Sequence, residues 1–252
     1  MRTSNIQTLI NPGARDFDQL AAEFRWRVPQ HFNIAEAVCD RHDALADRVA
    51  MITENDKGEC AEFRFGQLKK ASNKLANALA AQGITAGDRV AIVLPQRVET
   101  GVAHMAIYKI QAIAVPLSGL FGPDALNYRL KDSGAKLVIT DGAHIEVIES
   151  LKPELRDLQH VLNVDADQDF WGLLERASDL FALPLTPADT PALLIYTSGT
   201  TGPPKGATVA HRCLYGNLTG FELSQNFFPQ TGDLFWTPAD WAWTGGLIDA
   251  LL

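Results

Sequence analysis

A run of glycines, hydroxyl side chains and one lysine follows an apolar segment in the second half of the chain. Residues 192–196 read Ala-Leu-Leu-Ile-Tyr, and residues 197–206 read Thr-Ser-Gly-Thr-Thr-Gly-Pro-Pro-Lys-Gly. Glycines let backbone N–H groups approach oxygen atoms closely, hydroxyls add donors without bulk, and the lysine adds positive charge. A polyphosphate is the ligand that would use all three. The candidate ligand residues are Thr197, Ser198, Gly199, Thr200, Thr201, Gly202 and Lys205.

The spacing in this segment differs from that of a Walker A loop. Such a loop ends in Gly-Lys followed by Ser or Thr, whereas Lys205 is followed by Gly206 and Gly202 lies three residues before it. The alternative interpretation is a flexible Gly/Ser/Thr linker. Linkers seldom follow an apolar strand directly and seldom end in Pro-Pro-Lys-Gly, so the sequence favours a phosphate loop of another class.

The elements that would position this loop alternate between apolar strands and amphipathic helices. Strands are predicted at 89–94, 113–116, 136–140 and 158–163, and helices at 68–79, 98–109, 124–131 and 144–150. A hairpin is predicted from strands at 48–53 and 61–65. Such alternation indicates βαβ units, so we expect an α/β fold, a layered sandwich with largely parallel sheets.

Composition shifts suggest how the chain is divided. Residues 1–30 read as an N-terminal arm, and residues 31–181 as a first α/β subdomain. Three prolines mark residues 182–191 as a linker. Residues 192–252 would then begin a second α/β subdomain that carries the phosphate loop.

Charge and composition limit the possible partners. The net charge is −8 and the isoelectric point is near 5.2, which argues against nucleic acid or an anionic membrane surface as the main partner. The three widely spaced cysteines favour neither a disulfide framework nor a zinc site. The N-terminus lacks the apolar stretch of a signal peptide, and no apolar run could span a bilayer. We therefore expect a cytoplasmic protein.

Residues 197–206 resemble, without a departure, the phosphate-loop signature of the acyl-adenylate-forming superfamily. This group includes acyl- and aryl-CoA synthetases, luciferases and the adenylation domains of peptide synthetases. Residues 65–68, 87–90 and 114–117 look similar to the family as well. Residues 32–35 and 237–246 look most like acetyl-CoA and medium-chain acyl-CoA synthetases.

The resemblance implies a two-step reaction that uses ATP, Mg²⁺ and coenzyme A. A carboxylic acid would be converted to acyl-AMP and then to a thioester. Lys205 would be the catalytic cation, and Thr200 the hydroxyl near the metal. The resemblance also implies that residues 237–246 lie near the acyl pocket, with Asp240, Trp241, Trp243 and Gly245 as its candidate residues. Taken alone, the two tryptophans would more often be core residues, and His211 more often a cap or packing residue than a catalytic one.

The resemblance covers the whole chain but only about the first half of the family's length, so we expect the incomplete N-terminal domain of an adenylate-forming enzyme. The family's later motifs for adenine, ribose and magnesium are absent from the 252 residues. The chain alone is therefore expected to be inactive and to self-associate through its apolar end, Leu247, Ile248, Leu251 and Leu252. The alternatives are an aryl-CoA ligase or other adenylating domain, and an inactive nucleotide-binding fragment. A non-enzymatic interaction domain is disfavoured by the intact loop.

Overall fold

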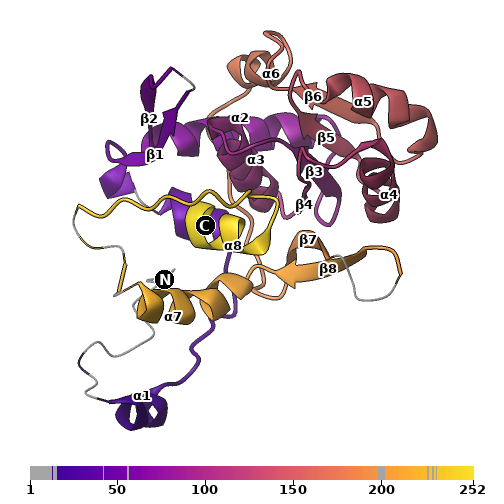
Figure 1. Cartoon of the computed structure of the whole chain (residues 1–252). Coiled ribbons are helices and arrows are strands. Elements are labelled where there is room, and N and C mark those ends of the chain that lie inside the picture. Colours follow the sequence, from indigo (N-terminus) through magenta and orange to yellow (C-terminus); the bar gives the residue numbers. More distant parts are fainter. Residues whose placement is uncertain are drawn as a thin grey trace.

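The computed structural model describes residue 13 and residues 16–41, 43–55, 57–197, 202–225, 227–228, 230 and 232–252 (Figure 1). The strands are β1 Val49–Glu54, β2 Cys60–Arg64, β3 Arg89–Val93, β4 Ile113–Pro116, β5 Leu137–Thr140, β6 His160–Asn163, β7 Pro191–Thr197 and β8 Lys205–Ala210. The α-helices are α1 Phe17–Glu23, α2 Phe65–Ala81, α3 Val98–Lys109, α4 Pro123–Ser133, α5 Ile145–Leu151, α6 Phe170–Arg176, α7 Cys213–Ser224 and α8 Thr244–Gly246. Shorter helical turns cover Glu36–Asp40, Asp43–Leu45, Lys152–Glu154 and Leu247–Leu251.

A six-stranded sheet in the order β6-β5-β3-β4-β7-β8 forms the centre of the fold. Every neighbouring pair from β6 to β7 is parallel, and only β8 runs antiparallel, beside β7. The predicted largely parallel α/β fold is confirmed. The predicted hairpin at the start of the chain is confirmed too, because β1 and β2 pair antiparallel in a separate small sheet.

Helices cover both faces of the main sheet, and the residues of β3 show how the faces alternate. Val90 and Ile92 belong to the larger hydrophobic cluster, which α2 and α3 cover. Ala91 and Val93 belong to a second cluster, which α4 and α5 cover. Because successive side chains of a strand point to opposite faces, an unbroken apolar strand is what a sheet buried on both sides requires.

Helix α2 follows the predicted pattern. Leu68, Leu75 and Leu79 lie on one face of the helix and are buried in the larger cluster. The helix ends before Gly83, whose φ of +84° is a conformation that glycine adopts without strain. The Ile84 N–H then donates to the Leu79 carbonyl at 3.1 Å, which satisfies one of the last carbonyl groups of the helix.

Helix α3 is buried on all sides and ends in a fully buried lysine. The Lys109 ammonium lies 2.7 Å from the Asp40 carboxylate and donates to Ser72 Oγ at 2.8 Å and to Asn73 Oδ1 at 2.6 Å. Its three donors are thus matched by three acceptors. Burial lowers the pKa of Lys109, and the Asp40 carboxylate opposes that shift.

The predicted linker is held by hydrogen bonds to the start of the chain. The Phe32 N–H donates to the Thr186 carbonyl at 2.9 Å, and the Ala188 N–H donates to the Gln30 carbonyl at 3.0 Å. Asn33 Nδ2 also reaches Thr186 Oγ1, at 3.0 Å. We call this contact between residues 30–33 and 186–188 the seam. Strand β7 follows the seam and joins the same sheet as β4, so the sheet continues across the predicted boundary. The division into two subdomains stays a prediction.

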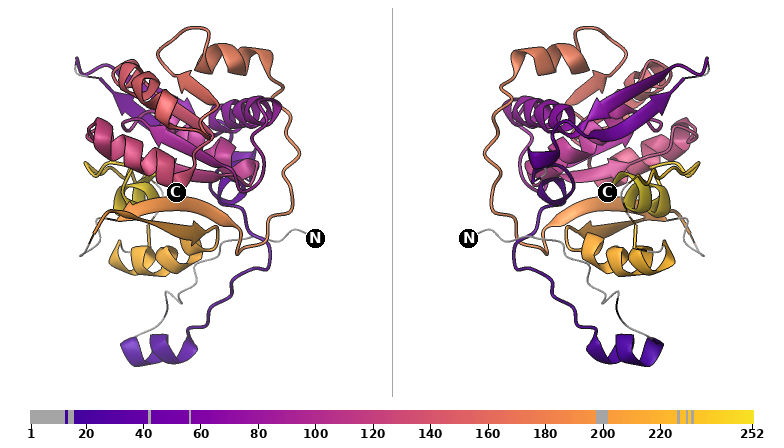
Figure 2. Two further views of the ribbon diagram at one scale, coloured as in Figure 1. Left: turned by 90° about the vertical axis from the view of Figure 1, so that its right-hand side faces the viewer. Right: turned by 90° about the vertical axis from the view of Figure 1, so that its left-hand side faces the viewer.

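Three features of the fold differ from or add to what the sequence predicts. Leu247 and Ile248 are buried, and Leu251 and Leu252 pack against the same cluster. The expectation that Leu247 and Ile248 lie exposed was therefore wrong, whereas self-association of the chain stays a prediction. Helix α6 was not predicted. Helix α1 lies apart from the rest of the fold and buries none of its residues (Figure 2).

In the part of the chain that the structure describes, no helix is long and apolar enough to cross a membrane.

Candidate functional site

The candidate site lies where the parallel strands of the main sheet end. Since β3, β4, β5 and β7 are parallel, their carboxyl ends meet at one edge. From β3 the chain passes to β4 on one side and then returns to β5 on the other, so the strand order reverses between β3 and β4. Such a reversal leaves a crevice outside the carboxyl ends of the two strands, where open α/β sheets bind ligands.

Residues 237–246 lie over this crevice. Gln96, just after β3, donates from Nε2 to the Ala239 carbonyl at 2.6 Å and to the Thr237 carbonyl at 3.3 Å. Ser118, just after β4, donates from Oγ to Asp240 Oδ2 at 2.7 Å. The segment that the sequence analysis assigned to the acyl pocket is therefore tied to the ends of the two strands that flank the crevice.

The four candidate pocket residues have different surroundings. Both oxygens of Asp240 are engaged, one by Ser118 and the other by the Ala242 N–H at 2.9 Å, so this carboxylate positions the segment. Trp243 is 46% exposed and packs edge-on against Phe121, with ring centroids 6.1 Å apart. The Trp241 ring nitrogen is buried and has no partner among the described residues. Apart from its chain neighbours and the backbone of its own helix, no described atom lies closer than 4.0 Å to a Cβ added to Gly245, so that position is open.

The candidate phosphate loop connects β7 to β8 at the same edge. Thr197, the last residue of β7, pairs across the hairpin with Lys205, the first residue of β8. Lys205 is exposed and forms no ion pair within the described ranges, so its charge is available to a ligand. Gly202 has a φ of +84°. The other four candidates, Ser198, Gly199, Thr200 and Thr201, lie outside the described residues.

Helix α4 holds both ends of this hairpin. Tyr128 donates from its hydroxyl to the Pro204 carbonyl at 3.0 Å, and Tyr196 donates to Asp132 Oδ2 at 2.7 Å. The Arg129 guanidinium stacks on the Phe121 ring, 4.1 Å from its centroid, and lies 5.7 Å from the centroid of Tyr196. Arg129 thereby connects the strand that leads into the phosphate loop with the ring against which Trp243 packs.

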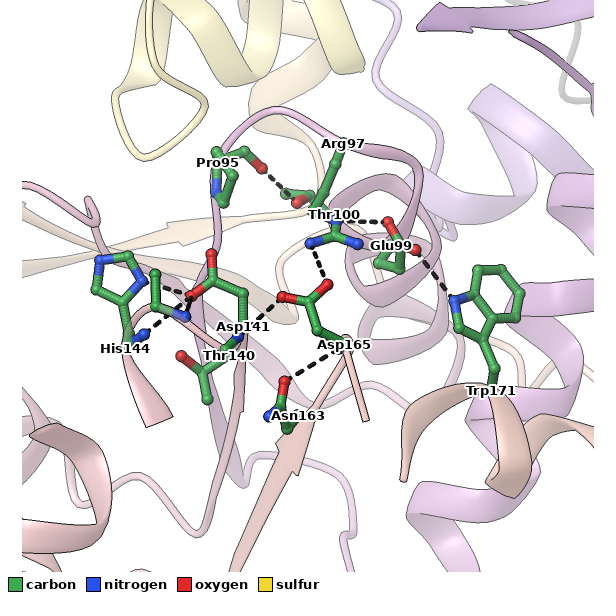
Figure 3. A network of polar contacts seen from close by, with 12 residues as sticks. Pro95, Arg97, Glu99, Thr100, Thr140, Asp141, His144, Asn163, Asp165 and Trp171 are labelled. Atoms are coloured by element: carbon green, nitrogen blue, oxygen red, sulfur yellow. Dashed lines mark hydrogen bonds and ion pairs between the residues drawn. The ribbon is translucent and has the colours of Figure 1, made fainter. Parts of the chain in front are cut away.

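Ion pairs tie together the turns that follow β3, β5 and β6 (Figure 3). Arg97 pairs with Glu99 at 2.7 Å and with Asp165 at 2.9 Å. The second oxygen of Asp165 accepts the Gly142 N–H at 2.9 Å. In the same network His144 lies 2.6 Å from Asp141. The turns after β3, β5 and β6 are therefore held together by mutually satisfied charges.

Sequence reasoning missed the residues that hold the site, namely Gln96, Ser118, Tyr128, Arg129 and His144. Gln96 and Ser118 each lie two residues after a predicted strand, and that signal could have been used. The expectation that His211 is a packing residue is confirmed. Its ring is fully buried, Nδ1 accepts the Ile34 N–H at 3.1 Å, and burial lowers its pKa to about 4.

The described residues contain no group of three or more His, Cys, Asp or Glu side chains that could hold a metal ion. Thr200, the one residue predicted near a metal, lies outside the described residues, so its role stays a prediction.

Comparison with known proteins adds a family match. A family model described as AMP-binding enzyme matches residues 40–252. Acetyl-coenzyme A synthetase of Pasteurella multocida is 33% identical over 95% of this chain and 40% of its own length. The enzyme of the same name from Streptomyces coelicolor is 34% identical over 88% of this chain and 38% of its own length. The chain thus spans about 40% of the length of these relatives.

Solved structures agree with the fold. The acyl-CoA synthetase of Brucella canis superposes with a TM-score of 0.80 at 29% identity, over 93% of this chain and 45% of that chain. ATP-bound MatB from Rhodopseudomonas palustris superposes with a TM-score of 0.72 at 26% identity, over 87% of this chain and 42% of that chain.

Proposed function

This chain belongs to the family of AMP-binding enzymes, and from that premise we propose that it forms the ATP-phosphate and acid-binding part of an AMP-forming acyl-CoA synthetase. The substrate is a short- or medium-chain carboxylic acid. The relatives named acetyl-coenzyme A synthetase support this substrate class, and the ATP-bound MatB structure supports ATP as the nucleotide.

The observation that carries the proposal is the placement of two segments at one edge of the sheet. The hairpin with Lys205 follows β7, and residues 237–246 lie over the ends of β3 and β4. Since β7 is the neighbour of β4, phosphates bound at the hairpin would lie beside an acid bound under residues 237–246. Holding two reactants next to each other is the main requirement of a displacement at phosphorus.

In the proposed reaction a carboxylate oxygen attacks the α-phosphorus of ATP. The bond from that phosphorus to the β-phosphate oxygen breaks, which gives acyl-AMP and pyrophosphate. The coenzyme A sulfur then attacks the acyl carbon as its proton is lost, and AMP leaves with the former carboxylate oxygen. Lys205 stabilises the negative charge that gathers on the departing pyrophosphate, in the manner of a preorganised electrostatic contact.

The remaining assignments extend this proposal to the other ligands. Ser198, Gly199, Thr200 and Thr201 complete the phosphate loop around Lys205. Mg²⁺, when bound, would neutralise phosphate charge, and Thr200 is the residue proposed to lie near it. Trp241, Trp243 and Gly245 border the acid, and Asp240 fixes the segment that carries them. A cytoplasmic location follows from the same interpretation.

The test is product analysis with the intact protein. ATP and coenzyme A are supplied with acetate, butyrate, hexanoate or benzoate, and AMP, pyrophosphate and acyl-CoA are quantified. Equal amounts of the three products, with a straight-chain acid preferred, are expected. A preference for benzoate would support an aryl-CoA ligase, and AMP release without a thioester would support another adenylating domain. Bound ATP with no turnover of any acid would support an inactive nucleotide-binding protein.

A further inference from the structure

His144 connects two turns at the carboxyl edge of the sheet. Its Nδ1 lies 2.6 Å from Asp141 Oδ1, in the turn after β5, and its Nε2 lies 2.9 Å from the Gly119 carbonyl oxygen, in the turn after β4. The ring leaves no space beside Gly119, where an added Cβ would meet its Cε1 and Nε2 atoms at 2.9 Å. The two turns therefore meet through this one ring.

Both neighbours of the ring are acceptors. A carboxylate and a backbone carbonyl cannot donate a hydrogen bond, so both ring nitrogens must carry a proton for both contacts to form. A neutral imidazole has only one N–H. The geometry is thus that of an imidazolium, whose side chain is about one-fifth exposed.

The turn that His144 holds also holds the candidate acid site. Ser118 precedes Gly119 and donates to Asp240 Oδ2, while Phe121 follows it and packs against Trp243. The Ser118 hydroxyl also accepts the Leu120 N–H at 3.2 Å, which keeps the turn compact. A shift of the Gly119 carbonyl would therefore move both contacts to residues 240–243.

We propose that His144 is a positioning residue, whose protonated ring fixes the Ser118–Gly122 turn against residues 240–243. The acid pocket then has its assembled shape only while the ring carries both protons. The inference rests on the proposed function only where it calls this region an acid pocket.

The charges around the ring fix the direction of the pH dependence. The Asp141 carboxylate contacts the ring. The next carboxylate, Asp165, accepts the Gly142 N–H and is paired with Arg97. Residues 118–122 carry no ionisable side chain. Burial lowers the pKa of His144, but the hydrogen bonds to Asp141 and to the Gly119 carbonyl outweigh it, so the pKa is raised. The contact between the His144 ring and the Ser118–Gly122 turn is therefore intact at low pH. It is lost as the pH rises through the raised pKa of His144.

Deprotonation breaks one specific contact. The remaining proton stays on Nδ1, next to the negative Asp141 carboxylate, because a charged acceptor binds a donor more strongly than a carbonyl does. Nε2 then presents a lone pair to the Gly119 oxygen, which repels it. The turn is released from the ring, whereas Asp141 keeps its contacts to the Ala143 and His144 N–H groups.

The experiment is an NMR titration of the 252-residue chain from pH 5 to 9. It follows the ring protons of His144 and the indole N–H of Trp243, assigned with His144→Gln and Trp243→Phe. We expect the His144 midpoint to lie above the ordinary value of about 6.5, and the Trp243 signal to shift with the same midpoint. His144→Gln should abolish the Trp243 step.

The matched control is His160→Gln. His160 begins β6 and so lies at the amino edge of the sheet, away from the site; this variant should keep the Trp243 step. The proposal is overturned if His144 titrates at or below about 6.5, if the Trp243 signal has no step at the His144 midpoint, or if that step survives in His144→Gln.

A second readout separates this inference from the proposed function. In the active intact enzyme, the KM for the acid should rise above the His144 midpoint, with a smaller change in kcat, and His144→Gln should flatten that profile. An intact protein that makes no acyl-CoA would contradict the proposed function, while the NMR titration would still decide the role of His144.

Discussion

Gly246 packs directly against the backbone of Asp240. A Cβ added to Gly246 would lie 2.6 Å from the carbonyl oxygens of both Asp240 and Ala239. The same Asp240 carbonyl accepts the Trp243 N–H at 3.0 Å. The close approach therefore presses the end of α8 onto the segment that Gln96 and Ser118 anchor, and only glycine leaves room for it.

Gly246→Ala should displace this segment, since backbone oxygens cannot yield as a flexible side chain can. We expect a loss of about 1–3 kcal/mol in the free energy of unfolding, typical of overpacking, together with weaker acid binding. Urea titration and the KM for the acid measure the two effects. Gly245→Ala is the matched control for stability alone, because the nearest contact of its added Cβ is Asp249 Oδ2 at 4.0 Å. Equal stability of the two variants would contradict the close packing.

Lys205→Ala should slow acid-dependent pyrophosphate release in the intact protein by about 10²–10³, the usual effect of removing one electrostatic contact to a transition state. The fold should be unchanged, because Lys205 is exposed and contributes no apolar packing. ATP–pyrophosphate exchange and far-UV circular dichroism are the measurements. Lys70→Ala, which removes an exposed lysine from α2, is the control. Exchange at the wild-type rate in Lys205→Ala would refute the role of this lysine.

Lys109→Met should cost about 3–5 kcal/mol in the free energy of unfolding, because it leaves the Asp40 carboxylate next to the core without its partner. Lys152→Met removes a lysine whose ion pair with Glu149, at 3.7 Å, is exposed. Such surface pairs contribute at most about 1 kcal/mol. The free energy of unfolding of both variants, measured by chemical denaturation at neutral pH, is compared with that of the wild type. A similar small loss in both would show that the buried pair contributes little.

Two buried histidines should make the protein less stable in acid. Burial lowers the pKa of His104 to about 3 and that of His211 to about 4, below the value of about 6.5 expected when the chain is unfolded. The free energy of unfolding that each neutral, buried histidine contributes is fully present above about pH 6.5. It is lost as the pH falls, by about 1.4 kcal/mol per pH unit for each histidine. His144, with its raised pKa, acts in the opposite direction.

The measurement is the free energy of unfolding in urea at several values between pH 7.5 and pH 5, for the wild type and for His104→Leu. Removing His104 should lower the slope of the unfolding free energy against pH by the amount that corresponds to one bound proton, whatever the substitution does to stability at neutral pH. An identical slope in the two proteins would contradict the assignment.

The sequence predicted the parts of the fold that depend on local patterns. In β3 and along the leucine face of α2, burial follows from position in the repeat. Asn73 is an exception: the pattern places it off the apolar face of α2, but it is buried because it accepts from the Lys109 ammonium. Helix α6 escaped prediction because it follows a polar stretch and contains Gly172, which weakens its helical signal.

The contacts that assemble the site could not be predicted in this way. Ser118 and Asp240 are 122 residues apart, and Tyr128 and Pro204 are 76 apart. Nothing in the neighbourhood of either residue in the sequence specifies its partner. His144 presents the same difficulty, because its role depends on a backbone carbonyl in another turn. Every residue has a backbone carbonyl, so the sequence does not indicate which one the ring contacts.

The seam between residues 30–33 and 186–188 also has a consequence for how the chain folds. Asn33 and Thr186, which hydrogen-bond across it, are 153 residues apart. Closing so long a loop costs chain entropy that contacts already formed must offset. Strands β3 to β6 join through much shorter connections and can assemble first. We therefore expect the seam to close late, and β7, which begins just after it, to bring the phosphate hairpin to the sheet in one of the last steps of folding.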